Sequence, residues 1–349
     1  MRTAAFHWVL GMTLLLGGIV LSNNQANAST CGNAVIARWF DNRDAAISLR
    51  FDDSLASHVD YVIPVLNRYG IKATFMVNPG LERYQMHRDF WERKVPAMGH
   101  ELGNHTAHHR GARTIREAER EIGEVSELIW RLYPTRSRVT VFASGGGRRC
   151  LWGGRQWSDA APEYKQLVAK YNLIDLYDGH HPATGINSRD SEVSIDKRLH
   201  DAINTHGHLP FVFHNIGTPT MLERMRALVD GFEATCRKEQ FEQFLDRLSR
   251  VRNKVWIAPL TQILKYEHEY RNAKLEMIDS GEHFYKYRLI AAGDPMYDQE
   301  LTVVASVATS INAKVYQGSI LIKHSIVDGH KIMFNVRPVS SVVIINNIS

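Results

Sequence analysis

The sequence predicts an α/β fold built on a parallel sheet, followed by a small all-β module. Between about residues 45 and 270, short apolar runs alternate with amphipathic helical stretches, which is typical of repeated strand–helix units. After about residue 273 the runs are of β type, are broken by Gly, Asp and Asn, and include no convincing helix. We therefore expect a parallel sheet, either a barrel or doubly wound, and then a sandwich-like module.

The elements of the first part can be placed in order. Residues 46–51 (AISLRF) predict a strand, residues 57–70 a helix closed by Gly70, and residues 73–77 a second strand. A long helix is expected after Thr114, because Glu117 three residues on completes a capping box. Later buried strands are predicted at residues 139–144, 173–177, 210–216 and 254–260.

The bulk composition is that of an ordinary globular protein. The 349 residues are 44% hydrophobic and 23% charged, which allows a sizeable core. The formal net charge is +5, but the basic residues are scattered, so we expect no nucleic-acid partner. Cys31, Cys150 and Cys236 form no CxxC pair, and the sequence leaves their disulfide pairing open, as it does the oligomeric state.

The N-terminus predicts a signal peptide over residues 1–28. Arg2 precedes an apolar run at residues 9–21, and Ala26-Asn27-Ala28 matches the small-x-small pattern of a cleavage site. The run is shorter than the roughly 20 residues needed to span a bilayer. We expect an exported protein, periplasmic or secreted, with no stable membrane insertion after cleavage; the alternative is an uncleaved anchor.

Two adjacent aspartates, Asp52 and Asp53, follow the first predicted strand directly. The carboxyl ends of strands in parallel α/β folds are where active sites collect. Neighbouring carboxylates in such a turn point in different directions, so one can bind a metal while the other faces a water. The alternative is a pair that caps the next helix.

The segment GHELGNHTAHH predicts a metal site. His105 and His109 are four residues apart, which places both imidazoles on one side of a helical turn and within reach of one ion. His108 between them should point elsewhere. The alternative is an exposed His-rich loop.

A further histidine, His214, ends a strongly apolar predicted strand. One Asp and two His supply three ligands and leave positions open for water and substrate, as hydrolytic zinc sites require. A second carboxylate can then accept a proton from the water, and a histidine opposite can protonate the leaving group.

The order and spacing of these residues resemble the polysaccharide deacetylase family, whose members share the NodB homology domain and belong to carbohydrate esterase family 4. RFDDS stands where the family has T-F-D-D-G, HTAHH matches H-[ST]-x-x-H, and FVFHNIG is similar to its late strand with the catalytic histidine. The resemblance covers roughly residues 45–273. It implies a distorted (β/α) barrel with fewer than eight regular units.

The resemblance also implies roles for single residues and a cofactor. Asp52 would be the general base and His214 the general acid. A divalent metal, Zn²⁺ with Co²⁺ or Ni²⁺ as alternatives, would be held by Asp53, His105 and His109. The implied domains are a deacetylase domain at residues 29–272 and a β-rich module at residues 273–349.

Two family motifs are altered in this sequence. The third motif should place an arginine and a proline after a strand, but Ala143 occupies the arginine position and proline is absent. Backbone N–H groups of Gly145-Gly146-Gly147, or Arg148, could replace the cation. The fourth motif has only weak candidates in Asp175 and Asp178. Two aromatic residues in this region, Trp152 and Trp157, are candidates for facing a sugar ring.

These observations predict a metal-dependent hydrolase that removes acetyl groups, N-linked rather than O-linked, from a polysaccharide. The acetylated partner would be chitin, peptidoglycan or an exopolysaccharide. A first alternative is a metal-dependent cyclic amide hydrolase of the same fold, which the leader and the β module disfavour. A second is a carbohydrate-binding protein that keeps the metal site without turnover.

Overall fold

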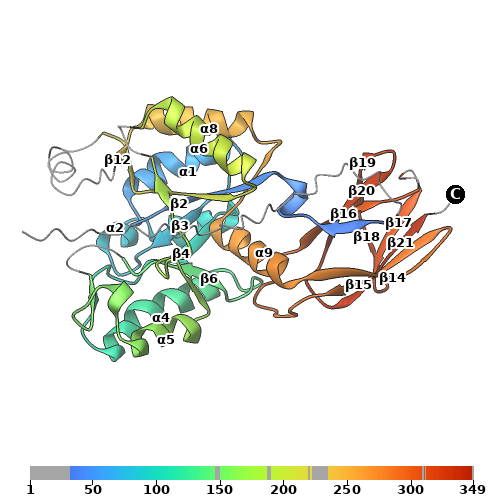
Figure 1. Ribbon diagram of the computed structural model, residues 1–349. Helices are drawn as coiled ribbons and strands as arrows, with labels where there is room; N and C mark the ends of the chain where they lie inside the picture. The colour runs from blue at the N-terminus through green and yellow to red at the C-terminus, as the bar shows by residue number, and fades with distance from the viewer. Residues whose placement is uncertain are drawn as a thin grey trace, which may run out of the picture.

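The computed structural model describes residues 32–145, 150–186, 190–218, 235–308 and 312–347, together with Met221 and Ser310. It has a helix-rich part that contains a parallel sheet and, beside it, a part made of β-strands (Figure 1). The leader predicted at residues 1–28 and the candidate Arg148 lie outside the described residues.

A curled parallel sheet forms the centre of the first part, in the strand order β8-β6-β4-β3-β2-β10-β9. A further strand, β13, pairs with the first half of β2. The predicted α/β class and distorted barrel are confirmed, with β8 and β9 as the two ends of the sheet. The strands are β2 (Ala45–Phe51), β3 (Thr74–Val77), β4 (Glu101–Asn104), β6 (Thr140–Phe142), β8 (Leu173–Asp175), β9 (Thr184–Gly185), β10 (His208–Phe213) and β13 (Val255–Ile257).

Helices cover the sheet, with α1, α6 and α8 gathered above it and α4 and α5 below it in Figure 1. The Thr114 hydroxyl accepts a hydrogen bond from Glu117 N at 3.2 Å, so the predicted cap of α4 is confirmed. A π-helical turn, His58–Val62, leads into α1. The helices are α1 (Ile63–Arg68), α2 (Glu82–Gln85), α3 (Val95–Ala97), α4 (Ile115–Leu132), α5 (Pro162–Lys170), α6 (Glu192–Asn204), α8 (Lys238–Arg250) and α9 (Leu260–Asn272).

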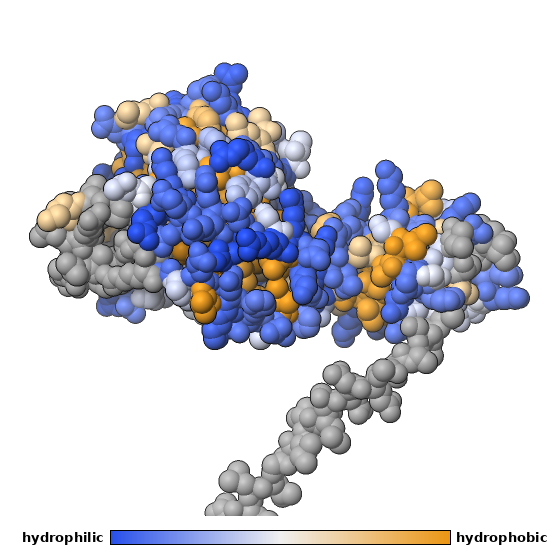
Figure 2. Space-filling model, turned by 90° about the horizontal axis from the view of Figure 1, so that it is seen from above, coloured by the Kyte–Doolittle hydropathy of each residue, from blue (hydrophilic) through white to orange (hydrophobic). Residues whose placement is uncertain are grey.

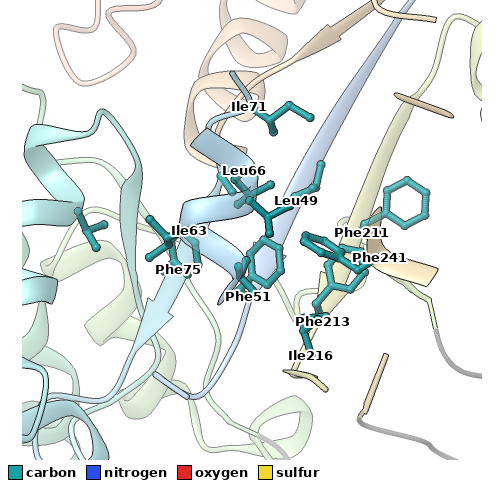
Figure 3. Packing of buried hydrophobic residues seen from close by; sticks show 14 of the residues in the cluster. Leu49, Phe51, Ile63, Leu66, Ile71, Phe75, Phe211, Phe213, Ile216 and Phe241 are labelled. Atoms are coloured by element: carbon teal, nitrogen blue, oxygen red, sulfur yellow. The ribbon is translucent and has the colours of Figure 1, made fainter. Parts of the chain in front are cut away.

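The two faces of β2 have different surroundings. Ile47, Leu49 and Phe51 belong to the main hydrophobic core. The Phe51 ring stacks on the rings of Phe75 and Phe213, with centroids 5.1 Å apart in both pairs (Figure 3). The residues between them, which include Arg50, face the inside of the curled sheet, because side chains alternate along a strand.

The β-rich part consists of two antiparallel sheets, as expected for the C-terminal module. Their strand orders are β1-β16-β20-β19 and β14-β15-β21-β17-β18. The first sheet includes β1 (Ala34–Ile36), from the N-terminal end of the described chain. The others are β14 (Lys274–Gly281), β15 (Phe284–Ile290), β16 (Leu301–Ser306), β17 (Ala313–Gln317), β18 (Ile320–Ile322), β19 (His324–Asp328), β20 (Lys331–Val336) and β21 (Ser341–Asn347).

Helix α9 ties the two parts together. Its Tyr266 lies in the core of the β-rich part and donates a hydrogen bond to the Ala37 carbonyl at 2.8 Å. Figure 2 shows hydrophobic side chains gathered on the β-rich part, where Ile320 and Leu321 of β18 are exposed. Among the described residues, no helix has the length and apolar character needed to cross a membrane.

Candidate metal and catalytic site

The carboxyl ends of four parallel strands meet at one edge of the sheet. Asp52 and Asp53 follow β2, His105 follows β4, Ala143 follows β6 and His214 follows β10. With His109, from the loop after His105, the structure brings together all five residues predicted for the site. A cavity of about 610 Å³ is lined by Asp52, Asp53, His105, His109 and His214, together with Arg50, Leu176, Tyr177, Gly179, His181, Pro182, Ala183 and Val212.

Asp53, His105 and His109 form the candidate metal centre, since their ligand atoms all lie within 4.8 Å of one another. Asp53 Oδ1 is 3.5 Å from His105 Nε2 and 3.6 Å from His109 Nε2. Ligand atoms about 2.1 Å from a tetrahedral zinc ion are themselves about 3.4 Å apart. One carboxylate and two imidazoles at this spacing therefore fit a first-row divalent metal.

Hydrogen bonds orient His105 toward this centre. Its Nδ1 lies 2.9 Å from the Ala143 carbonyl oxygen, which can only accept, so Nδ1 carries a hydrogen and Nε2 faces Asp53. The Asn78 amide donates to the carbonyls of His105 and Thr106 at 2.6 and 3.0 Å. The sequence had indicated neither Asn78 nor the Ala143 carbonyl.

The two metal-site histidines lie in a loop, so the expected helical turn is wrong. The extended strand β4 runs to Asn104, and the loop then folds back through left-handed residues at Thr106 (φ 64°) and His109 (φ 54°). The Thr106 hydroxyl accepts a hydrogen bond from His109 N at 3.1 Å and closes the loop. His108 points elsewhere, as predicted, because its Nδ1 and its backbone N both bind the buried Glu121 at 2.8 Å.

The charges of the centre act on the protonation of its three candidate ligands. Burial opposes ionisation of Asp53, but the His105 imidazole 3.5 Å away holds the pKa of the carboxyl well below its ordinary value. Burial and the charge of His105 lower the pKa of His109, which favours the neutral ring that a metal ligand requires. The pKa of His105 is raised, because Asp52 and Asp53 outweigh the effect of burial.

Arg50, which sequence reasoning missed, binds Asp52. Arg50 Nε donates to Asp52 Oδ1 at 2.8 Å and Nη2 donates to Oδ2 at 2.7 Å. Burial alone would raise the pKa of Asp52, but the charge of Arg50 holds it below its ordinary value. The period of two along β2 could have revealed this pair, since residues 50 and 52 share one face of the strand.

The backbone of His214 is fixed by the turn that follows the aspartates. Burial lowers the pKa of His58 to about 4, so the ring is neutral, and its Nε2 lies 2.6 Å from the His214 carbonyl oxygen. The neighbouring Ser57 hydroxyl donates to Asn215 Oδ1 at 2.8 Å. These bonds link the chain after β2 to the end of β10.

The altered third motif approaches the metal centre without contributing a side-chain cation from its described residues. Gly145 has a φ of +79°, and a methyl group there would lie 2.9 Å from His109 Nε2 and 3.0 Å from Cys150 Sγ. Cys150 and Cys236 are buried; Cys31 lies outside the described residues.

The tryptophans proposed to face a sugar are buried, so that prediction is wrong. Trp152 and Trp157 pack edge to face, with ring centroids 4.9 Å apart, in a core between α4 and α5. Trp157 Nε1 donates to Asp175 Oδ2 at 2.7 Å. The rings extend an apolar core, and the candidate Asp175 satisfies an indole N–H there.

Comparison with known proteins bears on the segment that carries the first two motifs. The polysaccharide deacetylase family model matches residues 41–151, and the resemblance predicted from the motifs is confirmed there. His214 lies beyond the matched residues. A gellan lyase from Bacillus sp. is 22% identical over 299 residues, which cover 78% of this chain and 11% of that protein. The chain thus spans about a tenth of the length of that relative.

Three solved structures are similar to part of this chain. The peptidoglycan deacetylase PdaC from Bacillus subtilis is 15% identical, with 64% of this chain and 91% of that one covered at a TM-score of 0.39. The catalytic domain of the peptidoglycan N-acetylglucosamine deacetylase from Eubacterium rectale is 18% identical, with 62% and 88% covered at 0.39. A CE4 family pseudoenzyme from Bacillus anthracis is 14% identical, with 63% and 65% covered at 0.37.

Substitution of the histidines should separate metal ligands from their neighbour. We expect His105→Ala and His109→Ala to lower the content of bound zinc, from about one ion per chain, because each removes one of three ligands. His108→Ala is the matched control and should keep the metal. Elemental analysis of protein loaded with zinc and then dialysed measures the difference, and an empty site in His108→Ala alone would refute the assignment.

The close approach of Gly145 gives a second test of the metal centre. Gly145→Ala should weaken zinc affinity by about 10- to 100-fold, because the methyl group displaces His109 from its place in the centre. Gly154 also has a positive φ, +84°, but a methyl group there would have no atom within 4 Å. Gly154→Ala therefore controls for backbone strain. Equal zinc affinities in a competition titration would contradict the predicted displacement.

Proposed function

We propose that this chain is a metal-dependent hydrolase that removes acetyl groups from a polysaccharide. The observation that supports this most strongly is the spacing of the Asp53, His105 and His109 ligand atoms, on the same cavity that Asp52 and His214 line. The family match over residues 41–151 supports the same reaction class. We propose zinc as the metal, with cobalt or nickel as alternatives.

The catalytic roles follow from the chemistry of the side chains. When bound, the cation polarises the scissile carbonyl and lowers the pKa of a water. Asp52 accepts the proton of the attacking water, since each of its oxygens keeps a lone pair that Arg50 does not use. His214 donates a proton to the leaving group, which for an N-acetyl substrate is the amine nitrogen.

We propose an N-acetylated polymer such as chitin, peptidoglycan or an exopolysaccharide as the substrate, with O-acetyl as the less favoured linkage. The relatives support an extended carbohydrate, because their names refer to gellan and peptidoglycan. The leader predicted at residues 1–28 agrees with a polymer outside the cytoplasm and disfavours a small cyclic amide.

Acetate release should separate the two adjacent aspartates. Asp52→Asn should keep the metal but lower kcat by about 10²–10⁴-fold with little change in KM, because an amide cannot accept the proton. His214→Ala should behave in the same way. Asp53→Asn should lose metal, because a weak neutral ligand replaces an anionic one. Acetate release and zinc content are measured for each variant, and chelated wild type should regain activity with zinc or cobalt.

The exposed Asp60, in the π-helical turn, provides a matched control as Asp60→Asn. Near-wild-type turnover by Asp52→Asn would place the general base elsewhere. A wild type that binds zinc and an acetylated glycan but releases no acetate would instead support a carbohydrate-binding protein without turnover.

Export should leave a mature chain that begins at or near Ser29, because the small-x-small pattern of Ala26-Asn27-Ala28 marks the cleavage site. Mass spectrometry of protein recovered from the periplasm or the medium measures the terminus. An intact Met1 on protein held in the membrane would overturn this prediction.

A further inference from the structure

Two positions depart from the family pattern, one by the loss of a cationic side chain and the other by the gain of one. Residue 143 is Ala where the third motif has an arginine, and residue 50 is Arg where T-F-D-D-G has Thr. Ala143 is buried in a small apolar cluster that includes Val141 and Leu176. Within the described part of the chain, the cation paired with Asp52 is Arg50.

Arg50 lies in strand β2, and its ion-pair partner Asp52 is the first residue after that strand. The side chains are 7% and 2% exposed, and both ends of the guanidinium fork bind the two carboxylate oxygens. This arrangement fixes the plane of the carboxylate, which a single hydrogen bond cannot do. Tyr177 lines the same cavity as Arg50. The orientation of Asp52 is therefore set by β2 and does not require a side chain from the end of β6.

Burial of this pair is not explained by stability alone. Two charges lose their hydration when they are buried, and packed apolar residues of similar size can be equally stabilising. The pair also lines the cavity that contains His214 and the metal centre. Without Arg50, the buried carboxylate of Asp52 would lack its paired cation and would no longer be held in one orientation.

We propose that Arg50 is the positioning residue for Asp52, which it holds in the orientation that accepts the proton of the attacking water. Arg50 thus supplies from strand β2 the cation that Ala143 cannot supply from the third motif. This inference rests on the proposed function, because the proton transfer belongs to that reaction.

A kinetic mutant cycle tests whether Arg50 acts through Asp52. Arg50→Gln should lower kcat for acetate release by about 10- to 100-fold, with KM and zinc content unchanged, because Asp52 loses its orientation. In the Asp52→Asn background, the same substitution should cause no further loss. Arg50→Lys keeps the charge without the fork, and should recover part of kcat.

A matched arginine controls for general destabilisation. Arg198 of α6 forms an ion pair with Asp190 through Nη2 at 2.7 Å, and neither residue lines the cavity of the metal centre. Arg198→Gln should lower the unfolding temperature but leave kcat unchanged. A second readout needs no activity: the unfolding temperatures of Arg50→Gln, Asp52→Asn and the double variant. The double variant should lose less than the sum of the single losses, because the two side chains are coupled.

The proposal would be overturned by an unchanged kcat in Arg50→Gln, or by equal kcat losses from Arg50→Gln with and without Asp52→Asn. It would also be overturned if the decreases in unfolding temperature of the two single variants add up to that of the double variant. Loss of zinc in Arg50→Gln would also overturn it, because Arg50 would then support the metal centre. If the wild type releases no acetate from any substrate, the proposed function fails, while coupled unfolding temperatures would still support the positioning of Asp52.

Discussion

The parallel pairing of β2 with β10 is the constraint on which the site depends. Phe51 and Phe213 are paired in register, so the residues that follow them, Asp52 and His214, are brought to the same edge of the sheet. Asp52 N also donates a hydrogen bond to the Phe213 carbonyl at 2.9 Å. A slip of one residue would move every side chain of β2 to the opposite face, and would replace the buried phenylalanine with a carboxylate. Packing of Phe51 therefore also determines the position of the catalytic candidates.

Much of the site could be predicted because strand periodicity and strand ends are visible in the sequence. Asp52, Asp53 and His214 directly follow apolar runs, and such positions meet in any parallel sheet. The same periodicity places Arg50 on the face of β2 that Asp52 continues. A single arginine in an apolar run, however, does not by itself indicate which residue it pairs with. The Ala143 carbonyl and the Asn78 amide could not be found in this way, since their roles depend on which loops lie next to them. The pairing of β1 with β16 could not be predicted for the same reason, since the two strands are far apart in the chain.

The loop of His105 and His109 shows why ligands are easier to predict than conformation. A spacing of four residues suits a helix, but β4 is held extended by its pairing with β3 and β6 up to Asn104. Beyond that point, left-handed residues at Thr106 and His109 fold the loop until both Nε2 atoms approach Asp53. Several backbone geometries bring two imidazoles together over four residues. The donor set was therefore predictable, whereas the backbone depended on tertiary contacts.

The electrostatics of the adjacent aspartates links Arg50 to the proposed metal. Two adjacent carboxylates, of which Asp52 is buried and Asp53 half-buried, would repel each other unless each had its own positive partner. Arg50 is the partner of Asp52, while Asp53 faces the two imidazoles that complete the candidate metal centre. An aspartate whose pKa is held low stays ionised, but it is also a weaker base. Such a base can accept a proton efficiently only if the pKa of the attacking water is lowered too. The proposed reaction therefore needs both the arginine that pairs with the general base Asp52 and the metal ion that the neighbouring Asp53 would hold. The arginine keeps the base ionised, and the metal ion would make the water acidic enough for this weaker base.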